Sequence, residues 1–194
     1  MTEKNYGGAN SFGFKGKTSA SGKESIVASV KSSSKDKKEV EFGQISEEVL
    51  EKYISAGKIH KQVMEYVRGF LKKDMLLIEI AEKIEIKIVE LGGKPAFPTN
   101  LSLNEIAAHY TPSLKDELRA NGLLKVDFGV EVGGYIADGA TSFDFSDDGR
   151  YAKMIELNKK ALALALDELG VGSAVKVIGN KISEIVDEDG RFRI

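Results

Sequence analysis

The sequence predicts a mixed α/β (α+β) fold in which amphipathic helices cover one face of a β-hairpin. Apolar residues recur at three- and four-residue steps from Val49 to Leu71 and again from Leu77 to Leu91, which is the period of a helix with one buried face. In residues 125–143, apolar residues instead recur at every second position on either side of a central Gly-Gly pair, as in the strands of a hairpin. With 194 residues, of which 42% are hydrophobic, the chain can bury a core between these elements.

The composition excludes several classes of protein. Since 28 basic residues stand against 30 acidic ones, the net charge is −2, and no general attraction to nucleic acid or to a membrane surface is expected. The absence of cysteine excludes disulfides, thiol catalysis and cysteine-ligated zinc. The first residues lack the apolar segment of a signal peptide, and no window approaches the ~18 apolar residues of a membrane span. We therefore expect a soluble, cytoplasmic protein without a membrane partner.

Two regions are expected along the chain. Residues 1–44 are rich in Gly, Ser and Lys and show no helical or strand period, so a disordered tail is predicted. Eight lysines against five acids give this tail a charge of +3 and leave −5 for residues 45–194. The tail is either simply solvated or makes a weak electrostatic contact with RNA or the ribosome. Residues 45–194 carry the periodic segments and should form the folded domain.

The first two helices carry recognisable end signals. Ser46 should cap the first helix, because a serine oxygen accepts a hydrogen bond from a free N–H of the first turn, and two glutamates follow where the helix dipole favours acids. The second helix should cover about 75–91 and end at Gly92. His60 lies off the apolar stripe of the first helix, so we expect a surface histidine rather than a ligand.

The other segments are shorter and less regular. Three further elements are predicted: a short strand over 104–109, a helix over about 149–169 and a helix over about 175–187. A strand should begin at Arg191. Because the chain then stops at Ile194, inside this strand, we expect a polypeptide that is cut short of its domain.

The hairpin places two acids on one face. If Gly133 and Gly134 form a two-residue turn, Asp138 lies opposite Gly129, and Asp127 lies opposite Ala140, two pairs further along. Because side chains alternate across a strand, the two aspartates are diagonal neighbours, about 7–8 Å apart at the backbone, and their carboxylates can converge. The other face carries valines and a phenylalanine and should be covered by the helices.

Two interpretations of these aspartates follow from the pattern. Two acids on a half-buried face repel each other and lose solvation unless a cation neutralises them, and hard divalent ions accept carboxylate oxygens readily. Solvent-exposed aspartates on an edge hairpin fit the same pattern. His109 is similarly either an ordinary polar loop residue or a proton donor or ligand near a metal.

Two stretches resemble a known family. FPTNLSLNEIAAHYTP at 97–112 and LLKVDFGVEVGGYIADGA at 123–140 are similar to the type II methionine aminopeptidases, particularly the archaeal form, within the pita-bread metallohydrolases. The motifs Asn-Glu-x-x-x-His, Asp-x-Gly-Val and Gly-Tyr-Ile-x-Asp occur in order with the expected gaps. The similarity runs from about residue 45 to residue 194 and does not cover the tail.

The resemblance implies a pseudo-twofold pita-bread fold, of which this chain is the N-terminal portion, and removal of the initiator methionine from nascent proteins by a hydroxide that two divalent ions activate. The pattern does not distinguish Co, Mn, Fe, Zn and Ni. Of five family metal ligands, Asp127 and Asp138 match the two aspartates, with Asp138 as the bridging carboxylate. His109 matches the histidine that hydrogen-bonds the substrate. The other three ligands would follow Ile194, so the site is expected to be incomplete and the chain inactive alone, unless a second chain completes the fold.

Two positions and two alternative functions complete the prediction. Gly139 departs from the family, which usually has threonine directly after the second aspartate, and a lost hydroxyl there could loosen the support of the ligand. Phe97 is a candidate wall of the methionine pocket, although a core phenylalanine fits equally well. The alternatives are a non-catalytic pita-bread protein that binds RNA, the ribosome or another partner, and a proline-specific relative such as prolidase. The stretch 97–112 favours the methionine enzyme.

Overall fold

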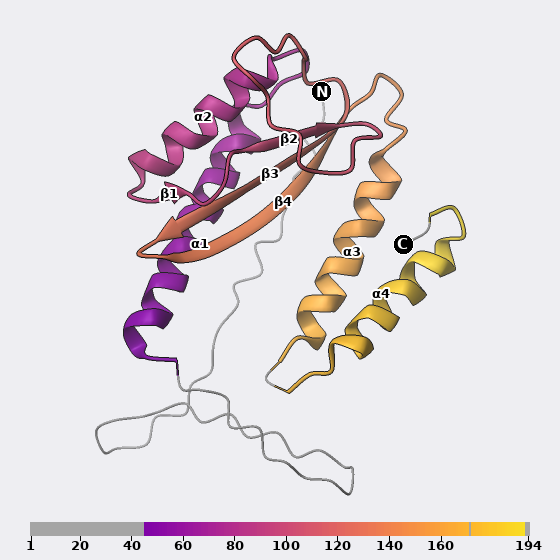
Figure 1. Ribbon diagram of the computed structural model, residues 1–194. Coiled ribbons are helices and arrows are strands. Elements are labelled where there is room, and N and C mark those ends of the chain that lie inside the picture. The colour runs from indigo at the N-terminus through magenta and orange to yellow at the C-terminus, as the bar shows by residue number, and fades with distance from the viewer. Residues whose placement is uncertain (1–44, 171, 193–194) are drawn as a thin grey trace, which may run out of the picture.

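The computed structural model describes residues 45–170 and 172–192 (Figure 1). The predicted tail, residues 1–44, lies outside the described residues, as do residues 171, 193 and 194. The elements in the described part are α1 (Glu47–Phe70), α2 (Leu77–Glu90), β1 (Lys94–Pro95), β2 (Asn100–Leu103), β3 (Gly122–Val132), β4 (Tyr135–Phe145), α3 (Ala152–Glu168) and α4 (Val175–Asp189).

Helix α1 begins and packs as its sequence predicts. The Ser46 hydroxyl accepts a hydrogen bond from the Val49 N–H at 3.3 Å, and two glutamates occupy the first turn. This N-cap satisfies one of the donors that a helix start leaves unpaired. The middle and the end of the apolar stripe are buried, through Ala56, Val63, Met64 and Val67. The stripe is not buried near the start of the helix, where Leu50 and Tyr53 are exposed.

Helix α2 also confirms the predicted stripe and its end. Its buried residues are Leu77, Ile80, Ala81, Ile84 and Ile88. Gly92 follows the helix with φ +89° and donates its N–H to the Val89 carbonyl at 3.0 Å. A left-handed residue at this position ends a helix, and glycine adopts that conformation without a steric penalty.

The sheet is built around β3. On one side β4 pairs antiparallel with the whole of β3, and on the other side β2 and β1 pair with successive parts of it. Asn100 is opposite Asp127 and Pro95 is opposite Val130, so residues 96–99 leave the ladder between them. This interruption lies beside Gly129, whose carbonyl accepts a hydrogen bond from the Ala96 N–H at 2.9 Å.

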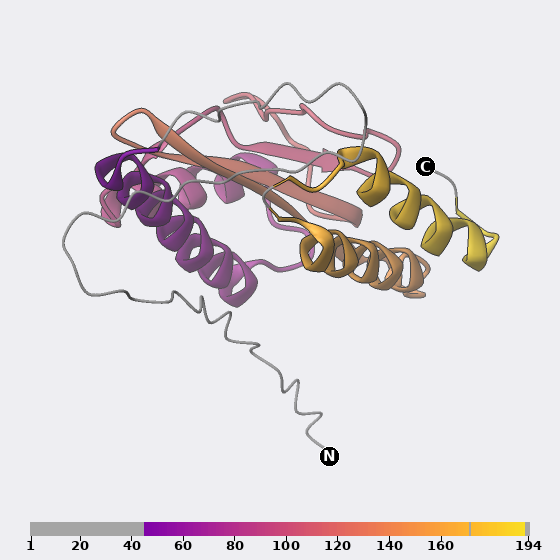
Figure 2. The same ribbon diagram turned by 90° about the horizontal axis from the view of Figure 1, so that it is seen from below.

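The hairpin has the predicted turn and register. Gly133 and Gly134 have φ +58° and +90°, as a tight two-residue turn with two positive φ angles requires. Val132 pairs with Tyr135, and every pair down to the Gly122 end follows the predicted register. The apolar face of β3 is buried, at Leu124, Val126, Phe128 and Val130, and α1 lies against it, as Figure 2 shows beneath the hairpin.

The predicted strand over 104–109 is wrong. The strand that pairs with β3 is β2, which ends one residue before Asn104. Asn104 has φ +46°, and its side-chain oxygen accepts a hydrogen bond from the Leu123 N–H at 2.9 Å. Ile106 then closes a turn by donating its N–H to the Leu103 carbonyl at 2.9 Å. An asparagine side chain that bonds the backbone in this way competes with a strand ladder.

Helices α3 and α4 occur where expected, but their apolar residues are less buried than their pattern suggests. They pack against each other, and α3 lies beside β4. In α3 only Ala161 is buried, whereas Leu162 is 57% exposed and Leu166 is 48% exposed. The predicted strand does not begin at Arg191, because residues 191 and 192 are not in a strand and the last two residues lie outside the described part. Among the described helices, none has the length and apolar character to span a bilayer.

Candidate metal centre

The two aspartates lie on one face of the hairpin, as the register predicts. Asp127 is half-buried and Asp138 is exposed, and Asp138 is directly opposite Gly129. Burial, and then the charge of Asp138, raise the pKa of the Asp127 carboxyl, while a hydrogen bond from Asn100 and the charges of His109 and His60 act in the opposite direction. Burial and the repulsion by Asp138 therefore both disfavour the charged form of Asp127, and an added cation would stabilise it.

Phe97 lies against the floor of this face. It belongs to the segment between β1 and β2 that leaves the ladder, and its ring approaches Gly129. A Cβ atom at position 129 would lie 2.6 Å from Phe97 Cε1 and 2.9 Å from Ala96 Cβ. The glycine thus allows an aromatic ring to reach the residue opposite Asp138. This position suits a pocket wall, and the binding role of Phe97 stays a prediction.

The loop that carries His109 is fastened to β2. The Leu101 N–H donates to the Tyr110 carbonyl at 2.7 Å, and the Thr111 hydroxyl donates to the Asn100 side-chain oxygen at 2.8 Å. The same asparagine is the cross-strand partner of Asp127 and counteracts the rise in the pKa of that carboxyl. One strand thereby holds both the half-buried aspartate and the loop that brings His109 within electrostatic range of it.

The backbone of His109 is strained. Its φ is +64°, in the left-handed region that is uncommon for residues other than glycine, although asparagine, aspartate and histidine are enriched there, and its side chain is exposed. Such a conformation persists only where surrounding contacts impose it, and these conformations cluster at functional sites. Asp74 and Asn104 also have positive φ angles, so the conformation alone assigns no role, and the function of His109 stays a prediction.

This strain leads to a prediction about stability. The His109→Gly variant should be more stable than His109→Ala by about 1 kcal/mol, because only alanine retains the cost of a Cβ in the left-handed region. Urea unfolding of the two variants measures the difference. Ser113, in the same loop and without a positive φ, provides the control, since glycine there should be no more stable than alanine. Equal stability of the two His109 variants would show that the loop relaxes freely.

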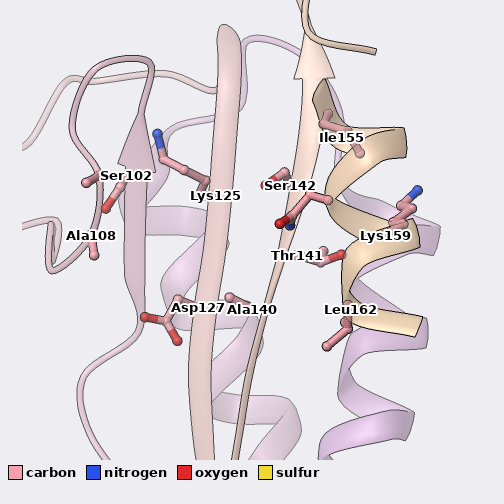
Figure 3. Close-up of a pocket in the computed structure, with 12 residues that line it drawn as sticks. Ser102, Ala108, Lys125, Asp127, Ala140, Thr141, Ser142, Ile155, Lys159 and Leu162 are labelled. Atoms are coloured by element: carbon pink, nitrogen blue, oxygen red, sulfur yellow. The ribbon is translucent and has the colours of Figure 1, made fainter. Parts of the chain in front are cut away.

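A cavity of about 300 Å³ opens beside Asp127 (Figure 3). The sheet contributes Lys125 and Ser142 to its lining, and α3 contributes Lys159. The Lys125 ammonium donates to the Asn104 carbonyl at 2.7 Å, and burial lowers its pKa. Sequence inspection missed Lys125, although its position two residues before Asp127 places it on the same face.

His60 is not the surface histidine that the sequence suggested. Its ring stacks on Phe128, with centroids 4.5 Å apart, and its Nε2 lies 3.3 Å from the Gly139 carbonyl oxygen. It lies off the main stripe because α1 packs against both α2 and the two strands of the hairpin. A stripe shows which residues are apolar, and it does not detect a polar ring that packs on an aromatic one.

The donors present fit part of a divalent metal site. Carboxylate oxygens are hard ligands, and Asp127 and Asp138 occupy diagonal positions on one face, from which their carboxylates can reach a common ion. Within residues 45–170 and 172–192, however, no group of three or more His, Asp or Glu side chains could enclose an ion. The two aspartates are therefore candidate ligands of a site to which other donors must contribute.

Residues 51–193 match the metallopeptidase family M24. The chain belongs to this family. It is 46% identical over 143 residues to a methionine aminopeptidase from Pyrococcus horikoshii and 40% identical over 142 residues to one from Methanocaldococcus jannaschii. These alignments cover 73% and 72% of this chain but 48% of each relative, so the chain spans about half the length of the curated relatives that it matches. Divalent metal ions are the cofactors that M24 membership implies.

Solved structures of metallopeptidases show the same fold. A methionine aminopeptidase from Thermotoga maritima superposes with a TM-score of 0.69 at 22% identity, over 75% of this chain and 62% of that one. A prolidase from Pyrococcus furiosus superposes with a TM-score of 0.63 at 21% identity, over 75% of this chain and 44% of that one. At such identities the likeness concerns the fold alone, and it confirms the predicted pita-bread architecture in this M24 chain.

Proposed function

We propose that this M24 chain forms part of an enzyme that removes the initiator methionine from nascent proteins, and that residues 45–194 are the N-terminal portion of its peptidase domain. The observation that carries the proposal is the pair Asp127 and Asp138, which lie on one face of the hairpin with His109 within electrostatic range of Asp127, in a chain 46% identical to a methionine aminopeptidase. The substrate would be the free amino end of a nascent polypeptide.

Asp127 and Asp138 would both hold the divalent metal. Two divalent ions, when bound, supply an activated water and polarise the peptide carbonyl. The half-burial of Asp127 suits this role, because a carboxylate that is partly withdrawn from water gains more from a nearby cation. Donors outside the described residues would complete the site, so this chain by itself is expected to bind metal weakly and to be inactive.

His109 would donate a hydrogen bond to the scissile peptide as charge develops on it. Its exposed ring and its anchored loop leave the imidazole free to meet a substrate while its distance from Asp127 is maintained. Phe97, beside the Asp138 end of the site, would contribute an apolar wall for the methionine side chain. The two residues thus approach the carboxylates from segments on either side of β2.

The activity can be tested in a chimera. Residues 45–192 of this chain would be joined to the part of the P. horikoshii methionine aminopeptidase that the alignment leaves uncovered. With Mn²⁺ or Co²⁺, the chimera should release methionine from a Met-Ala-Ser peptide and should leave an Ala-Pro dipeptide intact. Asp138→Ala should lower the rate by more than about 100-fold. This exceeds the loss of activity that is usual when a residue that only hydrogen-bonds a metal ligand is removed.

Controls separate this function from its alternatives. Glu117 is an exposed acid outside the site, and Glu117→Ala should retain the activity of the chimera. Preferential cleavage of Ala-Pro would instead indicate a proline-specific enzyme, which the prolidase-like fold allows. A folded chimera that binds metal but cleaves neither peptide would favour a non-catalytic binding protein. In that case, ribosome binding that is lost on deletion of residues 1–44 would identify the tail as the contact.

A further inference from the structure

His60 contacts both strands of the hairpin at one point. Its ring stacks on Phe128 of β3, with centroids 4.5 Å apart and an angle of 24° between the ring planes. Its Nε2 lies 3.3 Å from the carbonyl oxygen of Gly139 in β4. Because a carbonyl oxygen only accepts, the Nε2 atom carries the proton and donates it. A single α1 side chain therefore holds the cross-strand pair formed by Phe128 and Gly139.

The space beside Gly139 is filled by this imidazole. A Cβ atom at position 139 would lie 2.8 Å from His60 Cε1 and 3.1 Å from Nε2, closer than side chains normally approach. A threonine at this position, which the family pattern favours, therefore cannot coexist with the observed ring position. The glycine is matched to the histidine, and the ring takes the place of the missing side chain.

The held pair is adjacent to both candidate ligands. Phe128 directly follows Asp127, and Gly139 directly follows Asp138. Phe128 is fully buried, so its backbone cannot move without disturbing the core. A shift of the Gly139 backbone would also move Asp138, because adjacent residues of a strand belong to one pleated backbone. The imidazole thus packs on the face of the hairpin that α1 covers. Through the backbone it influences the spacing of the two carboxylates on the other face.

We propose that His60 is a positioning residue, which fixes the distance between Asp127 and Asp138 through its stacking on Phe128 and its hydrogen bond to Gly139. This inference rests on the proposed function, since it assumes that the two aspartates bind metal. It also explains why glycine is acceptable after the second aspartate. The support that a hydroxyl at position 139 would give comes instead from α1.

The test measures Mn²⁺ binding by the 194-residue chain without reference to activity. Mn²⁺ broadens the NMR signals of nearby amides, so a titration followed at the amides of Asp127 and Asp138 gives the affinity. His60→Ala and Gly139→Ala should each weaken Mn²⁺ binding about tenfold. This is the smaller end of the loss in affinity that is usual when a residue that supports a metal ligand is removed. In the double variant the loss should be smaller than the product of the two, because removal of the ring leaves room for the new methyl group.

Three further variants separate positioning from general stability. His60→Gln keeps a donor of similar reach and should recover most of the affinity, whereas His60→Phe keeps only the stacking and should not. Val67 is buried in α1 two turns away, so Val67→Ala should lower stability while the Mn²⁺ affinity stays within about twofold of wild type.

Each contrary result has a distinct meaning. Wild-type affinity in His60→Ala, or losses that multiply in the double variant, would overturn the positioning role while the metal site stands. Loss of affinity in Val67→Ala equal to that in His60→Ala would reduce His60 to a packing residue. Absence of broadening at both aspartates in the wild-type chain would overturn the metal site, and the positioning role with it.

Discussion

Replacing Asp127 by asparagine is expected to stabilise the metal-free chain at neutral pH and to remove the stabilisation that Mn²⁺ confers on the wild-type chain. The variant keeps the shape of the side chain and one accepting oxygen, but an NH2 donor replaces the second oxygen and the charge is lost. It therefore relieves both the burial of a carboxylate and its repulsion by Asp138. The gain should be about 0.5 kcal/mol, the scale of a cross-strand charge pair, since the half-exposed site is partly screened.

The pH dependence of the gain follows from linkage. Burial and the Asp138 charge raise the pKa of Asp127 above its ordinary value of 3.8, so the folded chain binds this proton more tightly than the unfolded chain does. The resulting stability is complete below pH 3.8 and is lost as the pH rises through the higher folded pKa. The difference between wild type and Asp127→Asn should accordingly be absent in acid and should reach its full value towards neutral pH.

Metal should reverse the order of stability. At a Mn²⁺ concentration ten times the dissociation constant, wild type should gain roughly 1.4 kcal/mol, or about 4 °C in Tm, and Asp127→Asn should gain little. Thermal unfolding with and without Mn²⁺, at acid and neutral pH, measures both effects.

Asp144, on the same hairpin, is the matched control for this experiment. Burial raises the pKa of Asp144, but hydrogen bonds from Ser146 and from the Tyr151 N–H outweigh that effect and lower it. Asp144→Asn should therefore destabilise at neutral pH while leaving the response to Mn²⁺ intact. Destabilisation by Asp127→Asn, or a full Mn²⁺ response in it, would mean that Asp127 is a structural residue.

Phe128→Ala should lower the free energy of unfolding by about 3–5 kcal/mol, the usual cost of truncating a buried phenylalanine. Phe128 is fully buried in the core cluster between the sheet and the helices, and it also supports the His60 ring. Such a loss is a large share of the roughly 5–15 kcal/mol that stabilises an ordinary domain. The variant should be partly unfolded at 37 °C.

Urea unfolding at 15 °C measures this loss and keeps the variant largely folded. Phe128→Leu retains most of the buried volume and should cost less than about 1.5 kcal/mol. Ile84→Val, a smaller deletion elsewhere in the same core, should cost about 0.5–1.5 kcal/mol. If Phe128→Ala cost no more than Ile84→Val, the hairpin would not be the centre of the core, and its support of the aspartates would be weak.

The elements that sequence inspection predicted well are those specified by neighbouring residues. The Ser46 cap, the glycine after α2 and the hairpin register all depend on contacts within a few positions, and all three are confirmed. The strand over 104–109 was misplaced because the side chain of Asn104 bonds Leu123, 19 residues away, and ends β2 early. No local pattern contains that bond.

The placement of Asp127 and Asp138 on one face was determined by the sequence alone, because the two-residue glycine turn and the alternation of side chains are both local properties. The tertiary structure decided what surrounds them. His60 reaches Gly139 across 79 positions, and His109 approaches Asp127 only because its loop is bonded to β2. These contacts depend on how α1 and the loop pack against the sheet. Such packing consists of many weak interactions between segments that are distant in the sequence, and the local periodicity of the sequence does not reveal them.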